Sequence, residues 1–241
     1  MGKIPKKIHY IWVGENQKPD IVEKCIKTWK QWMPEYEIIE WNEKNYDVKK
    51  NTYIREAYEQ KKYAFVSDYM RFDILYEQGG IYMDTDVELL KPIPEEILAN
   101  EAFTGVEYAG KVSPGLIFAC GPHNDLARRM KESYETETFD MAKLWTINCR
   151  ITSMLREKGF VENNTFQVID GLAIYPDEVF CGFDQDVREI KVTEKTISVH
   201  HYAATWKKKT LKNRLQTVIK KIIGVNGYRR LIHLKRWLKR K

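Results

Sequence analysis

The sequence has no run of eighteen or more uncharged apolar residues, so no segment is expected to span a membrane as a helix. Its first residues also lack the apolar stretch and small-residue cleavage site of a secretory signal, and the protein is expected to stay in the compartment where it is made. The four cysteines have neither metal-ligand nor disulfide-framework spacing, which fits a reducing environment. No glycine-rich phosphate-binding loop and no internal repeat is present.

Charge is distributed unevenly along the 241 residues. The formal net charge is +6, from 40 basic and 34 acidic residues. Residues 207–241 contain fourteen of the basic residues and no acidic one, which leaves 26 basic and 34 acidic residues, a net of −8, in the remainder. The division predicts an acidic domain over residues 1–206 and a basic tail that meets an anionic partner.

One segment carries two charged residues inside an apolar pattern. Apolar side chains at helical spacing on several sides of residues 63–77 predict a largely buried helix. Asp68 and Arg71 stand three residues apart on one face of it. Burial of either charge without a partner would cost on the order of several kcal/mol, so both are expected to pair or to serve a ligand. Gly79 and Gly80 then end the helix, because glycine adopts the left-handed cap conformation without a Cβ clash.

Two carboxylates follow a short apolar strand predicted over residues 81–83. Asp84 and Asp86 are separated by one residue and therefore point to the same side of an extended segment, which suits one hard divalent cation. Taken alone, the same pattern is also typical of a solvated turn. Half of a calcium loop is a further alternative, but Leu89 stands where such a loop needs glycine.

Strands and helices alternate along the chain. Apolar patterns predict strands over 8–13, 36–41, 102–106, 115–119, 166–169, 173–175 and 197–199, and helices over 19–32, 51–59, 124–134 and 147–158. This alternation is typical of an α/β fold with a mainly parallel sheet.

The charged helix, the double glycine and the strand ending in two acids together resemble the sugar-nucleotide glycosyltransferases of family 32. That family includes bacterial capsular polysaccharide enzymes, the yeast initiating mannosyltransferase and, more distantly, the clostridial glucosylating toxins. The resemblance covers residues 4–95 closely and residues 197–206 again, and between them only the order of elements matches. It implies the GT-A fold, a doubly wound sheet that binds a nucleotide at the carboxyl ends of its strands.

The resemblance also implies roles for four charged residues, which we take as the catalytic group. Asp86 is expected to bind a metal directly, and Asp84 to lie beside the same metal, nearer the ribose and the donor sugar. Asp68 and Arg71 are expected to hold hydroxyls of the donor sugar, with Arg71 also near the phosphates. The cofactor is expected to be Mn²⁺, with Mg²⁺ as the alternative.

The first predicted strand ends in a tryptophan before a glycine, as it does in family 32 and the related toxins. By this resemblance Trp12 stacks on the nucleotide base, and Val13 and Gly14 contact the nucleotide through their backbone. The alternative is that Trp12 is a core aromatic residue, which is the commoner use of tryptophan.

A histidine pair after the last predicted strand resembles the end of the family's catalytic domain. There a loop closes over the diphosphate and supplies a third metal ligand, for which His201 is expected and His200 is the alternative. An imidazole beside two carboxylates suits Mn²⁺ better than Mg²⁺, which prefers oxygen ligands. Thr205 and Trp206 are expected to contact the nucleotide sugar, although Thr205 stands where serine is commoner.

The basic tail contains two stretches, 211–223 and 228–238, whose apolar residues recur at helical spacing among cations. Such a basic amphipathic tail favours an anionic membrane surface. The alternative is that the first stretch packs on the domain. Nucleic acid is not expected as a partner because no known binding module is present. We therefore expect a cytoplasmic protein, peripherally associated with the inner face of the membrane.

These observations predict a metal-dependent, retaining glycosyltransferase that moves a hexose from a nucleotide sugar to a glycan acceptor. A UDP-sugar donor is favoured, and the acceptor is expected to be lipid-linked, in cell-surface or capsular polysaccharide synthesis. Residues 113–115, Trp145 and Asn148 are candidates for acceptor binding. Two alternatives remain open: a mannosyltransferase that uses GDP-mannose, and a membrane-surface binding protein without catalysis.

Overall fold

A mixed β-sheet forms the centre of the structure, a computed structural model that describes residues 3–143, 145–203, 220, 223–225, 227–232 and 234. Among the described residues the sheet has eight strands, with β2-β1-β3-β7-β5-β9-β8 in line and β6 paired to β5. Their bounds are β1 Lys7–Ile11, β2 Glu37–Trp41, β3 Gly80–Tyr82, β5 Ala102–Glu107, β6 Lys111–Val112, β7 Phe118–Cys120, β8 Gln167–Ile169 and β9 Leu172–Tyr175.

Most strands of this sheet point the same way. Strand β1 pairs in parallel with both β2 and β3, and β5 pairs in parallel with β9. Strand β7 is antiparallel to both β3 and β5, so these two also share one direction. The strands β2, β1, β3, β5 and β9 are therefore parallel in orientation, and the prediction of an α/β fold with a mainly parallel sheet is confirmed.

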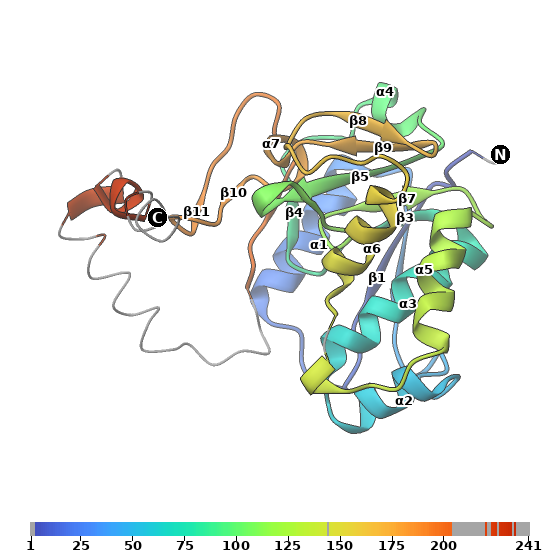
Figure 1. Cartoon of the computed structure of the whole chain (residues 1–241). Coiled ribbons are helices and arrows are strands. Elements are labelled where there is room, and N and C mark those ends of the chain that lie inside the picture. The colour runs from blue at the N-terminus through green and yellow to red at the C-terminus, as the bar shows by residue number, and fades with distance from the viewer. Residues whose placement is uncertain are drawn as a thin grey trace.

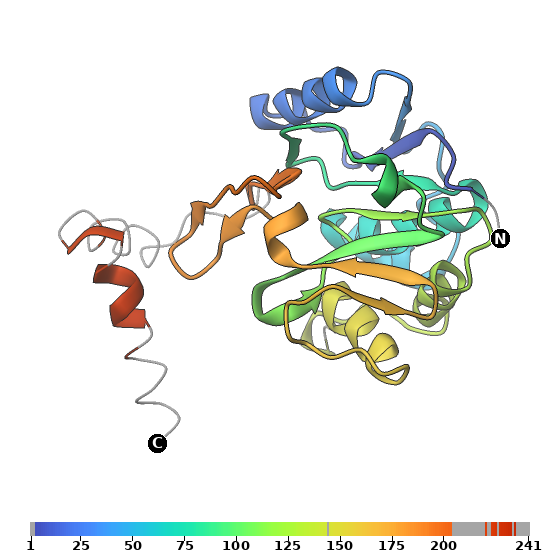
Figure 2. The same cartoon turned by 90° about the horizontal axis from the view of Figure 1, so that it is seen from above.

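Helices cover both faces of the sheet (Figures 1 and 2). The longer helices are α1 Asp20–Trp32, α2 Thr52–Glu59, α3 Tyr63–Gln78, α5 Asp125–Glu135 and α6 Ile147–Arg156. Successive strand residues enter different cores: Tyr82 and Phe118 pack with α2, α3, α5 and α6, whereas Ile81 and Ala119 pack with α1. Because both faces of these strands are buried, the strands have continuous apolar runs in the sequence.

Several shorter elements were not predicted from the sequence. They are α4 Glu95–Leu98, α7 Asp177–Phe180, the strands β4 Val87–Leu89 and β6, the hairpin of β10 Phe183–Asp184 and β11 Glu189–Ile190, and the short 3-10 helices Tyr108–Gly110 and Met141–Lys143. The strand predicted over residues 115–119 begins only at Phe118, because the N–H of Leu116 bonds to the carbonyl of Ser113 at 3.1 Å and closes a turn.

The last predicted strand is present as β12 Ser198–His200 and pairs antiparallel with β4. In this register Ser198 lies opposite Leu89, and His200 lies opposite Val87. The pairing returns the chain to the segment that directly follows the two acids. It therefore brings the histidine pair close to Asp86, over more than a hundred residues of sequence.

The tail beyond residue 206 lies mostly outside the described residues, as do Thr205 and Trp206. Two of its described cations contact the β10–β11 hairpin: Lys220 Nζ lies 3.1 Å from Glu189 Oε1, and an Arg229 guanidinium nitrogen lies 3.0 Å from Asp184 Oδ2. No helix within the described part of the chain is both long and apolar enough to cross a membrane.

The stop of helix α3 depends on a buried histidine in β1. Gly79 has a φ of 60°, and its N–H bonds to the carbonyl of Leu75, as the double-glycine prediction requires. The carbonyl of Gly79 accepts a hydrogen bond from His9 Nε2 at 2.8 Å, and His9 Nδ1 accepts one from Trp41 Nε1 at 3.1 Å. A Cβ on Gly80 would lie 2.8 Å from His9 Nε2, so glycine is required beside this neutral ring.

The first prediction concerns stability at acidic pH. Burial lowers the pKa of His9 to about 4, so the folded protein contains the neutral imidazole ring. Below the ordinary pKa of histidine the unfolded chain binds this proton and the native state does not, which lowers the free energy of unfolding by about 2 kcal/mol between pH 8 and pH 5. Urea denaturation at both pH values measures this loss. Between pH 8 and pH 5, the free energy of unfolding of His9→Gln is expected to fall less than that of the wild type by this amount. An identical pH dependence in both proteins would disprove the role of His9.

Candidate active site

A cavity of about 750 Å³ opens at the carboxyl ends of β1, β3 and β5. Open α/β sheets bind their ligands at this edge, because the loops there are free to diverge. Its lining includes four acidic side chains, namely Asp68, Asp84, Asp86 and Glu107. Among the described lining residues, the other titratable groups that carry or can gain positive charge are Arg71 and His200. The cavity is therefore acidic.

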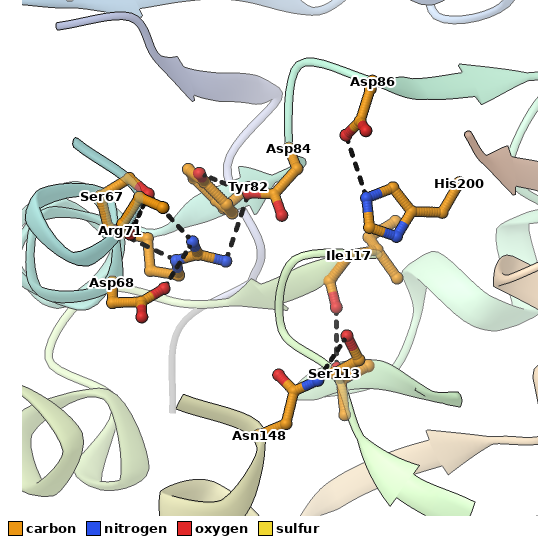
Figure 3. A network of polar contacts seen from close by, with 12 residues as sticks. Ser67, Asp68, Arg71, Tyr82, Asp84, Asp86, Ser113, Ile117, Asn148 and His200 are labelled. Atoms are coloured by element: carbon orange, nitrogen blue, oxygen red, sulfur yellow. Dashed lines mark hydrogen bonds and ion pairs between the residues drawn. The ribbon is translucent and has the colours of Figure 1, made fainter. Parts of the chain in front are cut away.

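Arg71 holds two of these acids together. One guanidinium nitrogen lies 3.0 Å from Asp68 Oδ1 and another lies 3.3 Å from Asp84 Oδ1, while the guanidinium stacks over the ring of Tyr82 with its carbon 4.6 Å from the centroid. Figure 3 shows these four side chains as one group. Arg71 also donates from Nε to the carbonyl of Ser67 one helical turn earlier, which fixes its direction. The pairing predicted for Asp68 and Arg71 is thus present.

Burial changes the proton affinities in this group. Burial raises the pKa of Asp68 to about 7, although Arg71 opposes the rise. Burial alone would lower the pKa of Arg71, but the charges of Asp84 and Asp68 raise it above its ordinary value. The guanidinium therefore stays charged, and Asp68 can change its protonation near neutral pH.

The two acids of the D-x-D pattern diverge. The N–H of Val87 bonds to the carbonyl of Asp84 at 3.0 Å, so residues 84–87 form a turn and the prediction of an extended segment is wrong. Asp84 faces Tyr82, whose hydroxyl donates to Asp84 Oδ1 at 2.8 Å. A Cβ on Gly115 would lie 2.2 Å from Asp84 Oδ2, so glycine is needed to leave room for this carboxylate.

Asp86 faces the C-terminal segment instead. Its Oδ1 lies 3.0 Å from His200 Nε2, and its Oδ2 accepts a hydrogen bond from the N–H of Ala203 at 2.8 Å (Figure 3). Burial raises the pKa of Asp86, but His200 and the N–H of Ala203 more than offset this and lower it below the ordinary value. Burial lowers the pKa of His200, and Asp86 in turn raises it above its ordinary value.

The two histidines lie on different sides of the strand. His200 lines the cavity, whereas His201 Nε2 lies 2.7 Å from Glu88 Oε2, and Lys24 pairs with the same carboxylate at 3.0 Å. The structure therefore places His200, the alternative ligand, beside Asp86 and directs His201 to Glu88.

The segment after β1 contributes one wall of the cavity. Trp12 and Val13 line it, and Trp12 also packs against the core on the α1 side, so its position is compatible with both roles considered for Trp12. The N–H of Gly14 donates to Glu43 Oε1, and a Cβ on Gly14 would lie 2.3 Å from a ring carbon of Tyr63. Gly14 therefore makes room for Tyr63, a cavity residue that sequence reasoning did not single out.

The opposite wall comes from the middle of the chain and from the segment after β12. Ser113 and Asn148, two of the residues considered for acceptor binding, line it together with Glu107 and Tyr202. Neither Glu107 nor Tyr202 was predicted from the sequence. The only sequence signal for Glu107 is its position as a charged residue at the end of an apolar strand.

The donor set in the cavity suits a divalent cation, since carboxylates of Asp84 and Asp86 and the imidazole of His200 line the same space. The arrangement is not a preformed metal site: across the described ranges no three His, Cys, Asp or Glu side chains converge to hold an ion. Asp86 and His200 are instead bonded to each other.

The fold and its acidic cavity define a ligand-binding domain of the open α/β class. Residues 19–104 match the family described as the glycosyltransferase sugar-binding region containing a DXD motif. This match covers about a third of the chain, and it confirms the resemblance to the DXD glycosyltransferases of family 32 that was drawn from the sequence.

Three relatives share parts of the chain. Subversion of eukaryotic traffic protein A of Legionella pneumophila is 26% identical over 164 residues, which are 56% of this chain and 25% of that protein. Inositol phosphoceramide mannosyltransferase 1 of Schizosaccharomyces pombe is 30% identical over 114 residues, 43% of this chain and 34% of that protein. Alpha-1,4-N-acetylglucosaminyltransferase of Homo sapiens is 39% identical over 69 residues, 28% of this chain and 18% of that protein. The chain spans at most 34% of the length of these relatives.

Two solved structures are similar to this chain over part of its length. The PaToxG glycosyltransferase has a TM-score of 0.49 and 21% identity, covering 65% of this chain and 69% of that one. A glycosyltransferase involved in the glycosylation of the major capsid of PBCV-1 has a TM-score of 0.46 and 11% identity, covering 87% and 98%.

The second prediction tests the bridging role of Arg71. Arg71→Met leaves Asp68 and Asp84 without their shared cation, and we expect the free energy of unfolding to fall by about 3–5 kcal/mol at pH 8. The loss is smaller at pH 6, because the pKa of Asp68 rises further and the native state takes up a proton that the unfolded chain does not bind. Chemical denaturation at both pH values measures it.

The matched control is Arg71→Met combined with Asp68→Asn, which removes the titrating carboxylate. This double variant is expected to recover part of the stability at pH 8 and to lose the pH-dependent component. Equal losses at pH 6 and pH 8 in Arg71→Met would contradict the prediction.

Proposed function

We propose that the chain is a metal-dependent retaining glycosyltransferase that moves a hexose from a nucleoside diphosphate sugar to a hydroxyl of a glycan. The observation that supports it best is the single cavity in which the acid pair of the family, Asp84 and Asp86, is held between Arg71 with Asp68 on one side and His200 on the other. We further assign the fold to the doubly wound GT-A type, in agreement with the helices on both faces of the sheet.

The charge of the cavity supports a metal requirement. Four carboxyl groups line it against one guanidinium and one imidazole, so a diphosphate entering alone meets like charge. A divalent cation held by Asp86, with Asp84 and His200 as the further candidates, reverses this repulsion. When bound, such a cation stabilises the negative charge that develops on the diphosphate as the glycosidic bond breaks.

The residues of the chain have separate tasks in this proposal. Trp12 offers its ring to the base, and Val13 lies beside it at the end of β1. Asp68 accepts hydrogen bonds from hydroxyls of the donor sugar, and Arg71 keeps Asp68 and Asp84 in place. Thr205 and Trp206, outside the described residues, remain proposed contacts of the nucleotide sugar.

We propose front-side attack for the retaining reaction. The oxygen of the acceptor hydroxyl forms the new bond to the anomeric carbon while the bond from that carbon to the phosphate oxygen breaks. The proton of the hydroxyl passes to the departing phosphate oxygen, so a second basic carboxylate is not required.

The donor and acceptor are assigned by class. A UDP-sugar is favoured and Mn²⁺ is the preferred metal, with GDP-mannose and Mg²⁺ as the alternatives. The name of the Schizosaccharomyces pombe relative specifies a mannosyl transfer to inositol phosphoceramide. A lipid-linked glycan acceptor, in cell-surface or capsular polysaccharide synthesis at the inner face of a membrane, agrees with the basic tail over 207–241.

The third prediction compares two neighbouring carboxylates. Asp86→Asn keeps the shape of the side chain but removes the charge that faces the cavity, and we expect hydrolysis of the accepted nucleotide sugar to fall by about 100-fold or more in Mn²⁺. Glu88→Gln is the matched control, since Glu88 bonds His201 and Lys24 away from the cavity.

The assay measures sugar release from a panel of labelled UDP- and GDP-sugars. Hydrolysis that Asp86→Asn and Glu88→Gln reduce equally would argue against the assignment of Asp86. Release of a nucleoside monophosphate in place of sugar would indicate a phosphotransferase. A wild type that neither hydrolyses a donor nor binds nucleotide in Mn²⁺ would favour the membrane-binding protein without catalysis.

The fourth prediction concerns the tail. Removal of residues 207–241 is expected to abolish sedimentation with vesicles that contain phosphatidylserine, because each cation near an anionic surface contributes about 1 kcal/mol. Donor hydrolysis by the truncated chain is expected to persist. A full-length variant with glutamine in place of the tail cations is the control for chain length. Binding to phosphatidylcholine vesicles that equals binding to the anionic ones would exclude an electrostatic role.

A further inference from the structure

Glu107 is a carboxylate in the cavity that the reaction described above does not use. It is the last residue of β5 and lies on the wall formed by the middle of the chain. Its Oε1 accepts a hydrogen bond from Asn148 Nδ2 at 2.5 Å, and its Oε2 accepts one from the hydroxyl of Tyr202 at 2.7 Å. Gln185 Nε2 lies 3.5 Å from the same Oε2.

The partners of Glu107 are all neutral. The other three acids of the cavity face either the guanidinium of Arg71 or the imidazole of His200. No lysine, arginine or histidine of the described ranges forms an ion pair with Glu107. A carboxylate fixed by neutral donors is not neutralised by an ion pair, and its remaining lone pairs are available to a ligand in the cavity.

Such a carboxylate selects among ligands by charge. It accepts strong, charge-assisted hydrogen bonds from hydroxyl groups, and it repels phosphates and acidic sugars. The groups beside it extend the same preference. Asn148 Nδ2 also lies 3.3 Å from the hydroxyl of Ser113 (Figure 3), and with the hydroxyl of Tyr202 the wall offers an amide and two hydroxyls. Ser113 is itself buried, at 4% exposure, and so is held in place.

This wall lies beside the groups proposed to bind the donor, since the rings of Tyr202 and His200 have centroids 4.1 Å apart, but its residues form a group of their own. Figure 3 shows Asp68, Arg71, Tyr82 and Asp84 as one group, Asp86 with His200 as a second, and Ser113 with Asn148 as a third. Glu107 ends β5, Ser113 directly follows β6 and Asn148 lies in the first turn of α6, and none of these elements carries an acid of the D-x-D pattern.

From this geometry we infer that Glu107, with Asn148 and Ser113, forms the acceptor subsite, and that Glu107 accepts a hydrogen bond from the attacking hydroxyl of a neutral sugar. The inference rests on the proposed glycosyltransferase function. Glu107 orients the hydroxyl, and the proton still leaves to the departing phosphate oxygen, so the carboxylate is unchanged by the reaction. In the absence of a sugar acceptor, water occupies the same place.

Donor hydrolysis tests the role of Glu107, because water is always available as the attacking group. The full chain is assayed in Mn²⁺ with the nucleotide sugar that the wild type hydrolyses. We expect Glu107→Gln to lower kcat by about tenfold or more, with the donor KM and the affinity for the nucleotide within about twofold of the wild type. Glu101→Gln, at the opposite, exposed end of β5, is the matched control and is expected to behave as the wild type.

The same assay distinguishes an indirect role. Tyr202 belongs to the segment whose Ala203 bonds Asp86, so a Glu107 that only anchors this segment would weaken Mn²⁺-dependent nucleotide binding when replaced. Nucleotide affinity that falls as much as kcat would therefore overturn the inference, as would an unchanged kcat. A covalent sugar on Glu107, detected by mass spectrometry, would overturn it as well, since the residue would then be a nucleophile.

A pair of soluble sugars tests the class of acceptor. Methyl α-glucoside and methyl α-glucuronide differ in charge at one carbon, and only the neutral one is expected to suppress release of free sugar from the donor. Glu107→Gln is expected to remove the difference. Equal suppression by both sugars in the wild type, or none by methyl α-glucoside, methyl α-galactoside or methyl α-mannoside, would overturn the assignment.

Failure of the proposed function is recognised separately, as a wild type that hydrolyses no donor. In that case saturation-transfer NMR with the same methyl glycosides examines the wall by itself. Binding to the wild type that Glu107→Gln weakens would support the subsite, and equal binding to both proteins, or none, would overturn it.

Discussion

The buried guanidinium of Arg71 is the interaction on which the cavity depends. Its contacts to Asp68 at 3.0 Å and to Asp84 at 3.3 Å join helix α3 to the segment after β3, across the sharp stop at Gly79. Two carboxylates at this edge of the sheet would otherwise repel each other in a poorly solvated space. One cation thus fixes the position of both acids, and the glycine at 115 leaves the room that Asp84 occupies.

The elements that depend on neighbouring residues were predictable. Helix α3, its stop and the pair of Asp68 with Arg71 follow from helical spacing and from the properties of glycine, which act within a few residues. The mainly parallel sheet followed from the alternation of strands and helices. The short elements α7, β10 and β11 were missed because segments of two to four residues show no periodicity of their own.

Contacts between distant segments were not predictable in the same way. His200 and His201 are adjacent, and a strand directs adjacent side chains to opposite faces, so the register between β12 and β4 decides which one meets Asp86. That register is a property of the folded sheet, with His200 opposite Val87. Glu107 was missed for the same reason, since Asn148 and Tyr202 reach it from segments 41 and 95 residues away.

The distribution of charge gives the two walls of the cavity different chemistry. Arg71 offsets one of the two negative charges of Asp68 and Asp84, and Asp86 is bonded to His200. Under the proposed function, this is the wall that takes the diphosphate together with its cation. Glu107 has only neutral partners, so the opposite wall favours uncharged hydroxyl groups. An anionic group that reached that wall would be repelled by the charge of Glu107, because no metal ion is proposed beside it. Under the proposed function, the difference between acids with and without an ion-pair partner therefore assigns the donor and the acceptor to different walls of one cavity.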